Sequence, residues 1–206
     1  MGSHEFPRSQ TGRHGTATSL SLLGRLKSQD REGWQRFVEL YAPVIYRWCR
    51  QAGIASDEAN DIAQEVFAAV MERIDAFRHQ RPGDTFRGWL WTIARNKICG
   101  HFRARQGEPR ARGGTAAQLQ LAQVPELPES LPDEDQAETE GLLSQRAFLL
   151  VQSQFEDRTW RAFWRTTVDQ QPVDQVANEI GISAASVYQA RHRVMKRIRE
   201  EFGELL

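Results

Sequence analysis

The sequence has only two cysteines, Cys49 and Cys99, and they lie far apart in the chain. This usage does not support a disulfide framework and is typical of a reduced, cytoplasmic protein. No apolar run approaches the roughly 20 residues that a membrane-spanning helix needs. The N-terminus also lacks the apolar segment of a signal peptide. We therefore expect a cytoplasmic protein without membrane insertion.

The usual motifs of enzymatic sites are missing as well. The sequence contains no glycine-rich phosphate loop, no nucleophile elbow and no paired-cysteine spacing for zinc. Cys99 and His101 lie two residues apart, but two ligands without further partners are not enough to hold a metal. We expect a protein that is not an enzyme and uses no metal and no cofactor.

Charge is balanced in total but segregated along the chain. There are 27 Lys and Arg residues against 27 Asp and Glu residues, so the formal net charge is zero. The segment 126–140 holds seven acids and no Lys or Arg, whereas 87–112 and 191–199 are strongly basic. Separate patches of opposite charge are compatible with a nucleic-acid-binding protein whose acidic residues lie elsewhere.

The distribution of glycine, proline and apolar residues predicts an all-α protein of two small helical domains joined by a flexible acidic linker. Residues 1–18 are polar and are predicted to be a disordered extension. The first domain is predicted to span 19–104 and the second 141–206. The linker is 105–140, where repeated glycine and proline exclude one long helix.

In the first domain, Pro43 lies inside a helical pattern and is expected to kink or divide the helix. Apolar residues on either side of it recur at helical spacing and are expected to face inward: Leu20, Leu23, Leu26, Trp34, Phe37, Val38, Tyr41, Ile45 and Trp48.

The stretch 61–103 is the most informative part of the chain. Its first helix has a buried stripe of Ile62, Val66, Val70, Ile74 and Phe77. Acidic and amide side chains lie off that stripe and should meet solvent or a partner: Asp61, Gln64, Glu65 and Glu72.

The second helix of this stretch has two faces. Leu90, Ala94 and Ile98 form an apolar face. The residues on or next to the other face suit stacking on bases and bonding to phosphates: Arg87, Trp89, Thr92, Arg95, Asn96 and Arg103. A solvated face with one stray tryptophan is the simpler alternative, and Trp89 either stacks on a base or packs between helices.

These residues carry a family resemblance. The pattern D-I-x-Q-E-V-F from Asp61, followed by F-R-G-W-L-W-T-I-A-R-N-K from Phe86, resembles conserved region 2 of the extracytoplasmic-function (group IV) sigma factors of bacterial RNA polymerase. The resemblance implies that the loop 79–86 and the helix after it bind and open the −10 promoter element. It also implies that Asp61, Gln64, Glu65 and Glu72 bind core RNA polymerase, on the clamp coiled coil of the beta-prime subunit.

The C-terminal part predicts a helix-turn-helix. A short helix from Val173 to Ile180 is broken by Gly181, and Ser183 is suited to cap a long final helix. The outward residues of that helix and its cap suit contacts with bases and phosphates in the major groove: Ser183, Ser186, Tyr188, Gln189, His192, Arg193 and Lys196. This part resembles region 4 of the same family, which reads the −35 element.

The linker leaves two interpretations open. Leu127 and Leu131 are among its apolar residues, which either bind a groove or belong to a merely soluble tether. The resemblance also implies control by an anti-sigma factor or a regulatory kinase, for which the first 18 residues and the acidic linker are candidate segments.

Taken together, the residues and the resemblance predict an alternative sigma factor that binds core RNA polymerase and promoter DNA. Two alternatives remain. One is a stand-alone helix-turn-helix regulator in which 19–103 is a sensor or dimerisation module. The other is a helical phosphorelay or adaptor protein, which would need an exposed histidine on an acidic helical hairpin, and none of the five histidines lies on such a hairpin.

Overall fold

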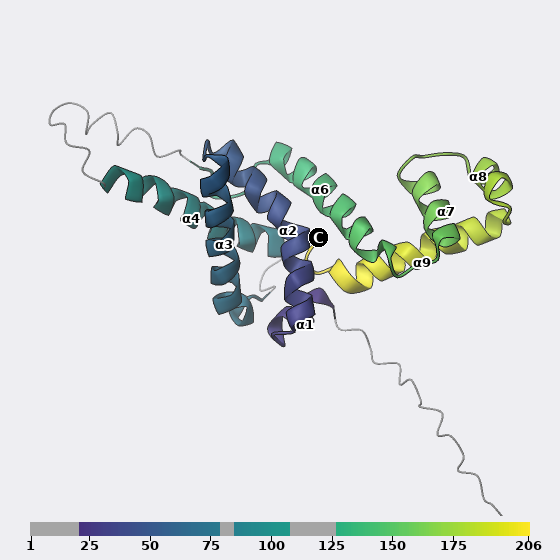
Figure 1. The fold of residues 1–206 in the computed structure, drawn as a ribbon, viewed down its shortest axis with the longest axis horizontal. Helices are drawn as coiled ribbons and strands as arrows, with labels where there is room; N and C mark the ends of the chain where they lie inside the picture. Colours follow the sequence, from purple (N-terminus) through teal and green to yellow (C-terminus); the bar gives the residue numbers. More distant parts are fainter. Residues whose placement is uncertain (1–20, 79–84, 108–126) are drawn as a thin grey trace, which may run out of the picture.

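The computed structural model describes residues 21–78, 85–107 and 127–206, and this part of the chain contains helices and no strand. The predicted all-α class is therefore confirmed. None of the helices in the described ranges is long and apolar enough to cross a membrane. The helices (Figure 1) are α1 (Leu22–Lys27), α2 (Arg31–Gln51), α3 (Ser56–Arg73), the 3-10 helix η1 (Ile74–Ala76), α4 (Phe86–Gly107), α6 (Asp133–Gln152), α7 (Asp157–Thr167), α8 (Val173–Ile180) and α9 (Ala184–Phe202).

Local side-chain caps fix where the first helices begin. The hydroxyl of Ser21 accepts a hydrogen bond from Gly24 N, and the carboxylate of Asp30 accepts from Glu32 N and Gly33 N. Such caps satisfy backbone donors that have no partner inside a helix. Arg25 also donates to Asp30 and holds the pKa of that carboxyl below its ordinary value. The turn between α1 and α2 is thereby fixed by polar contacts.

Pro43 does not divide the second helix. α2 is a single helix from Arg31 to Gln51 with Pro43 inside it. The apolar stripe predicted around it is buried, with two exceptions: Trp34 is half-buried and Val38 is exposed. Leu20 lies outside the described residues.

The core between α1, α2, α3 and α4 is rich in aromatic rings. Phe86, at the start of α4, packs against Phe37 and Tyr41 of α2 and against Phe77, with ring centroids 5.7, 5.6 and 5.3 Å apart. Trp48 packs edge-on against Trp91 at 5.2 Å. Large rings packed in this way contribute area burial and favourable ring geometry. They hold the first turn of α4 firmly against α2.

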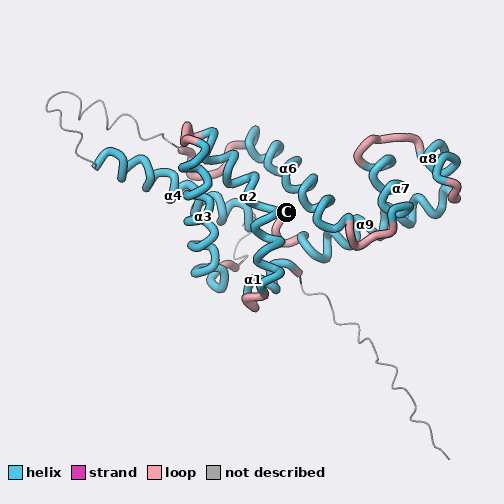
Figure 2. Tube along the Cα trace, in the orientation of Figure 1, coloured by secondary structure: helices cyan, strands magenta, loops and turns pink. Residues whose placement is uncertain are grey.

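A tight turn joins α8 to α9. Gly181 ends α8 with a φ of 73°, in the left-handed region that glycine enters without a side-chain clash. Ser183 then caps α9 by accepting from Ser186 N, as predicted. The short loops around α8 are visible in Figure 2. The small apolar cluster that joins α7, α8 and α9 consists of Ala162, Ala177, Val187 and Ala190.

The described helices share more core than two separate domains would. α6 lies along α2, and the C-terminal half of α9 reaches back to the first helices, so that the end of the chain lies beside α2 (Figure 1). Leu143, Val151 and Phe202 belong to the same buried cluster as Tyr41 and Trp48. In contrast, α7 and α8 lie at the far end of the molecule from α3 and α4 (Figure 1).

Two helices extend into the segment 105–140 that was predicted to be a linker. α4 continues to Gly107, and α6 already begins at Asp133, although 105–140 was expected to contain no helix at its acidic end. Pro132 stands at the N-cap of α6, and Asp135 lies in the first turn, where a carboxylate interacts favourably with the positive end of the helix dipole. The prediction of a linker considered only the repulsion between the acids of this segment.

Of the apolar residues in that segment, Leu131 is buried in the main core and Leu127 packs against it. This agrees with the groove-binding interpretation for these two residues. Residues 1–18 and most of the loop 79–86 lie outside the described residues, as does the middle of the linker.

Candidate nucleic-acid and polymerase interfaces

Three of the predicted −10 residues form an exposed row on α4. Thr92, Asn96 and Arg103 are all exposed, while Leu90, Ala94 and Ile98 on the opposite face are buried. The hydroxyl of Thr92 donates to Gly88 O at 3.1 Å. The prediction of one apolar and one polar face on this helix is therefore confirmed.

Trp89 lies at the edge of an open cavity beside that row. The cavity has a volume of about 350 Å³ and is lined by residues of η1, α4 and the loop ends between them: Ala76, Phe77, Arg78, Thr85, Gly88, Trp89 and Thr92. Trp89 is half-buried and packs on Phe77 and Phe86, with centroids 5.2 and 5.4 Å apart. The ring thus packs between helices and also borders the cavity.

The aromatic wall of this cavity is anchored from α1. Nζ of Lys27 donates to Phe77 O at 3.2 Å and lies 6.0 Å from the centre of the Phe77 ring. Arg78 donates to Phe77 O at 2.9 Å. Two cations therefore lie beside Phe77 of the cavity wall, and one of them, Arg78, lines the cavity itself, where positive charge attracts an anion.

The other two predicted −10 residues are in a different situation. Arg87 is only 8% exposed, and its Nη2 lies 2.8 Å from Oε1 of Glu140 on α6. Arg95 is half-buried, and its Nε donates to Leu127 O at 2.9 Å. Two of the arginines that the sequence assigned to DNA, Arg87 and Arg95, are therefore in contact with the segment 127–140.

The predicted polymerase-binding residues all lie on the outer side of α3. Asp61, Gln64, Glu65 and Glu72 are exposed. Glu65 forms an ion pair with Lys97 of α4 at 3.1 Å, and both side chains are partly exposed to solvent. An exposed pair of this kind contributes about 0–1 kcal/mol, so Glu65 remains available to another partner.

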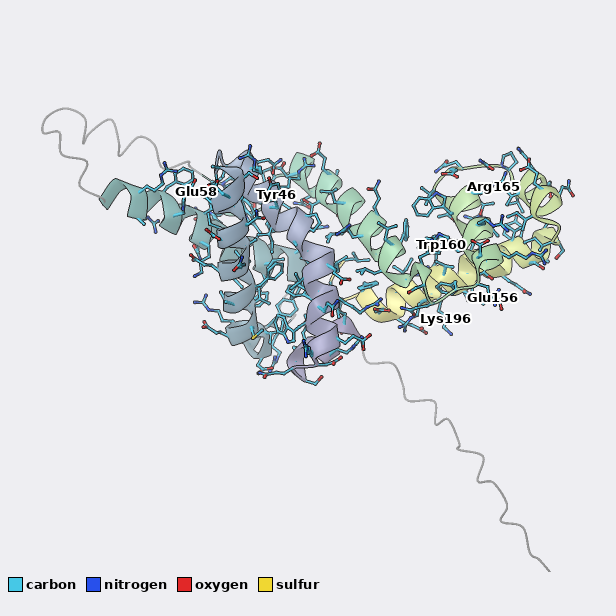
Figure 3. All side chains as sticks on the ribbon, viewed as in Figure 1. Tyr46, Glu58, Glu156, Trp160, Arg165 and Lys196 are labelled. Atoms are coloured by element: carbon cyan, nitrogen blue, oxygen red, sulfur yellow. The ribbon has the colours of Figure 1, made fainter. Side chains whose placement is uncertain are left out.

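A second cavity, of about 360 Å³, opens between α3 and α4 near Asn96 and Lys97. Glu58, at the start of α3 (labelled in Figure 3), lies 3.0 Å from Arg105 and 3.8 Å from His101, and His101 is one of the residues that line this cavity. Among the described residues, no group of three or more His, Cys, Asp or Glu side chains is placed to hold a metal ion.

The residues predicted to read the −35 element converge on one side of α9. Tyr188, Gln189, His192 and Arg193 are exposed and together line a surface cavity of about 370 Å³. Ser183 and Ser186 lie at the first turn, with their hydroxyl oxygens 2.9 Å apart. Lys196 is also exposed, one turn further along α9 (Figure 3).

One ion pair joins α7 to α8 beside this surface, and one weak hydrogen bond joins α7 to α9. Arg165 of α7 (labelled in Figure 3) pairs with Glu179 of α8, and this hydrogen bond holds the pKa of the Glu179 carboxyl below its ordinary value. Arg193 lies 3.4 Å from the hydroxyl of Thr159, at the long end of hydrogen bonding. The Arg193 guanidinium is therefore held only weakly and remains available.

The structure brings Arg78 and Thr85 to the first cavity. The sequence did not single out Arg78, and it gave Thr85 only as part of the loop 79–86. The only signal in the sequence for these cavity residues was that an aromatic residue precedes an arginine on each side of the loop, at Phe77-Arg78 and at Phe86-Arg87. The contact of Glu140 with Arg87 had no sequence signal, because it joins residues far apart in the chain.

Comparison with known proteins agrees with this geometry. Residues 37–108 match the family described as sigma-70 region 2. This range covers most of α2 together with α3 and α4, which carry the exposed row, the first cavity and the acidic face. The similarity to sigma-70 region 2 is therefore confined to these helices.

Part of the chain is also similar to curated proteins named as ECF RNA polymerase sigma factors. The chain is 29% identical over 89 residues to the ECF RNA polymerase sigma factor BldN of Streptomyces coelicolor, and 31% identical over 84 residues to the ECF RNA polymerase sigma factor SigW of Bacillus subtilis. These matches cover 43% and 41% of this chain, but only 33% and 43% of the relatives. The chain is therefore similar to extracytoplasmic-function sigma factors over part of its length, and it spans less than half the length of these two relatives.

A solved structure described as an RsbN-BldN complex is also similar, at 17% identity over 85% of this chain and 96% of that one. Its TM-score is 0.35, which supports no conclusion about arrangement or partners.

Proposed function

We propose that this protein is an alternative sigma factor that binds core RNA polymerase and directs promoter recognition, opening of the −10 element and transcription initiation. The observation that carries the proposal is the coincidence of the region 2 match with an exposed polar face on α4 beside an aromatic cavity.

The acidic side of α3 suits a basic protein partner. Asp61, Gln64, Glu65 and Glu72 are exposed on a helix that packs firmly on α2 and α4 through its other side. Complementary charge across an interface speeds encounter and fixes its register. In this proposal the face binds the clamp coiled coil of the beta-prime subunit.

The cavity and the row on α4 suit a displaced DNA strand. Taking a base out of the stack costs a few kcal/mol, and a protein offsets that cost by holding the base in a pocket. Trp89 and Phe77 provide aromatic surface, and the amide of Asn96 provides both a donor and acceptors for a base edge. Arg103 provides positive charge for the backbone.

The first turns of α9 suit the major groove. In a helix-turn-helix, residues near the N-terminal end of the second helix reach base edges. Gln189 and Arg193 have side chains that read bases by paired hydrogen bonds, and Lys196 suits a phosphate. In this proposal α8 and α9 form the helix-turn-helix that reads the −35 element.

The decisive experiment is transcription in vitro with core RNA polymerase and a library of random promoters. We expect transcripts from a defined set of templates when the chain is added, and none from core polymerase alone. Co-elution with core polymerase is the second readout. A chain that shifts duplex DNA but neither co-elutes with core polymerase nor supports transcription is a stand-alone regulator instead.

Regulation by an anti-sigma factor or by a kinase remains a prediction. Co-purification from the source cell, followed by mass spectrometry of partners and of phosphorylated residues, separates the two routes.

A further inference from the structure

Lys27 is a cation of α1 that contacts the wall of the first cavity without lining it. Its Nζ donates to Phe77 O at 3.2 Å and lies 6.0 Å from the centre of the Phe77 ring. Phe77 lines the cavity together with Trp89, whereas Lys27 is not one of the lining residues. The short-range contacts of Lys27 therefore reach the cavity through Phe77.

Phe77 stands where the 3-10 helix η1 ends. Its N–H donates to Ile74 O at 3.1 Å, and its backbone then becomes extended, with φ −65° and ψ 124°. A carbonyl at a helix end needs donors from side chains or water. Two cations supply them here, Lys27 from α1 and Arg78 from the next position in the chain.

The helix that carries Lys27 is itself firmly held. The hydroxyl of Ser21 caps its first turn. Its apolar residues are buried in the main core: Leu22, Leu23 and Leu26. Lys27 therefore ties the end of η1 to a fixed part of the molecule, across 50 positions of the sequence.

The Phe77 ring passes this support on to Trp89. Phe77 is only 4% exposed, and its ring lies 5.3 Å from that of Phe86 and 5.2 Å from that of Trp89. A hydrogen bond from a charged donor is roughly twice as strong as a neutral one, and a cation near a ring adds attraction. Loss of the Lys27 ammonium should therefore loosen Phe77 and, through the ring contact, Trp89.

We propose that Lys27 is a positioning residue for strand binding: it fixes Phe77, and through Phe77 it holds Trp89 where an unpaired base of a DNA strand stacks. This inference rests on the proposed function in naming the ligand of the cavity as a base. The physical reason is preorganisation, because a wall that is already fixed loses little conformational freedom when the base arrives. Lys27 thus raises the affinity for the base and not for the phosphates.

The anchoring is tested first without DNA, by hydrogen exchange of the complete chain read by mass spectrometry. Lys27→Met keeps an unbranched side chain but removes the ammonium, and the peptide that contains the Phe77 amide should exchange about tenfold faster. Lys27→Arg keeps a cationic donor and should exchange like the wild type. Arg31→Met, an exposed change of the same charge at the start of α2, should also match the wild type. Equal exchange in all four proteins would overturn the anchoring.

The effect on binding is measured by fluorescence anisotropy with two labelled single strands of equal length, a random-sequence DNA pool and a fully abasic strand. Lys27→Met should bind the random pool about fivefold more weakly, the lower end of what one stacked base contributes. It should bind the abasic strand like the wild type, and Lys27→Arg should restore binding to the pool. The comparison separates positioning from attraction by charge, since loss of that attraction weakens both strands alike.

Unchanged binding of the random pool by Lys27→Met, or an equal loss for both strands, would overturn the positioning role. If the wild type binds the two strands alike, the cavity takes no base and the inference is wrong. Transcription with core RNA polymerase decides the proposed function separately. A wild type that directs transcription, with no defect of Lys27→Met in exchange or strand binding, removes only Lys27. A chain that supports no transcription defeats the proposed function, while the two strand measurements still decide the inference.

Discussion

Glu201 of α9 and Arg36 of α2 form an ion pair with 2.5 Å between Oε1 and Nε, and the carboxylate is almost fully buried. Glu201 also lies 2.8 Å from Arg197 of its own helix. One carboxylate therefore joins the last helix of the chain to its second one. Removing one partner of such a buried pair leaves a charge without compensation.

Arg36→Met should lower the free energy of unfolding by about 1–3 kcal/mol, less than for an isolated buried pair because Arg197 still faces Glu201. Urea denaturation at neutral pH measures the change. Arg31→Met, an exposed change at the start of α2, is the matched control and should have little effect. Equal stability of both variants and the wild type would mean that the pair of Arg36 and Glu201 contributes nothing to the free energy of unfolding.

Arg193→Ala should weaken binding to a −35 duplex by about 1–3 kcal/mol, through loss of a bidentate base contact. Fluorescence anisotropy with a selected promoter fragment measures the affinity. Arg199→Ala removes an exposed arginine further along the same helix and should change affinity much less. An unchanged affinity for Arg193→Ala would remove this residue from the site.

Asn96→Ala should impair promoter opening while the closed complex still forms, because the amide acts on a base that is exposed only after strand separation. Permanganate reactivity of unpaired thymines reports opening, and a gel shift at low temperature reports closed-complex binding. Asn60→Ala makes the same change at an exposed position of α3 and should leave both steps intact. Equal loss of both steps in Asn96→Ala would indicate a structural role.

Asp61→Asn combined with Glu65→Gln should weaken co-elution with core RNA polymerase and reduce its dependence on salt, since attraction between exposed charges is screened. Glu32→Gln with Glu39→Gln, on α2, removes the same charge from another face. If both pairs of changes have the same effect on co-elution, the acidic side of α3 is not the docking face.

The free energy of unfolding should fall as the pH rises from 9 to 11, because burial raises the pKa of the Cys49 thiol from its ordinary value of 9.0 to about 11. Within this range the unfolded chain releases the thiol proton and the folded chain keeps it, so stability is lost with rising pH. The expected loss is about 1–3 kcal/mol.

Cys49→Ala should remove this part of the pH dependence. Burial also raises the pKa of Tyr41, but that residue is common to both proteins, so their difference isolates the thiol. Parallel stability curves over this pH range would contradict the assignment.

Much of the local structure was predictable from the sequence. Leu90, Ala94 and Ile98 recur at helical spacing, and they are buried while Asn96 is exposed, because the turn of a helix fixes which residues share a side. Gly181 and Ser183 predicted the turn before α9, since their conformational and capping preferences act within a few residues.

The sequence did not predict what lies over those helices. Arg87 looked like another cation of the −10 face, but Glu140 pairs with it from a helix that was expected to begin later. Likewise, Glu201 was one acid among several near the C-terminus, with no sign that it would meet Arg36.

The sequence by itself determined the helices, their apolar and polar sides and the family resemblance, because these depend on the chemistry of near neighbours along the chain. Only the tertiary structure decided which cationic side chains face solvent and which lie beneath α6. That choice depends on contacts between residues far apart in the chain, where apolar burial and charge pairing act together and leave no periodic pattern in the sequence.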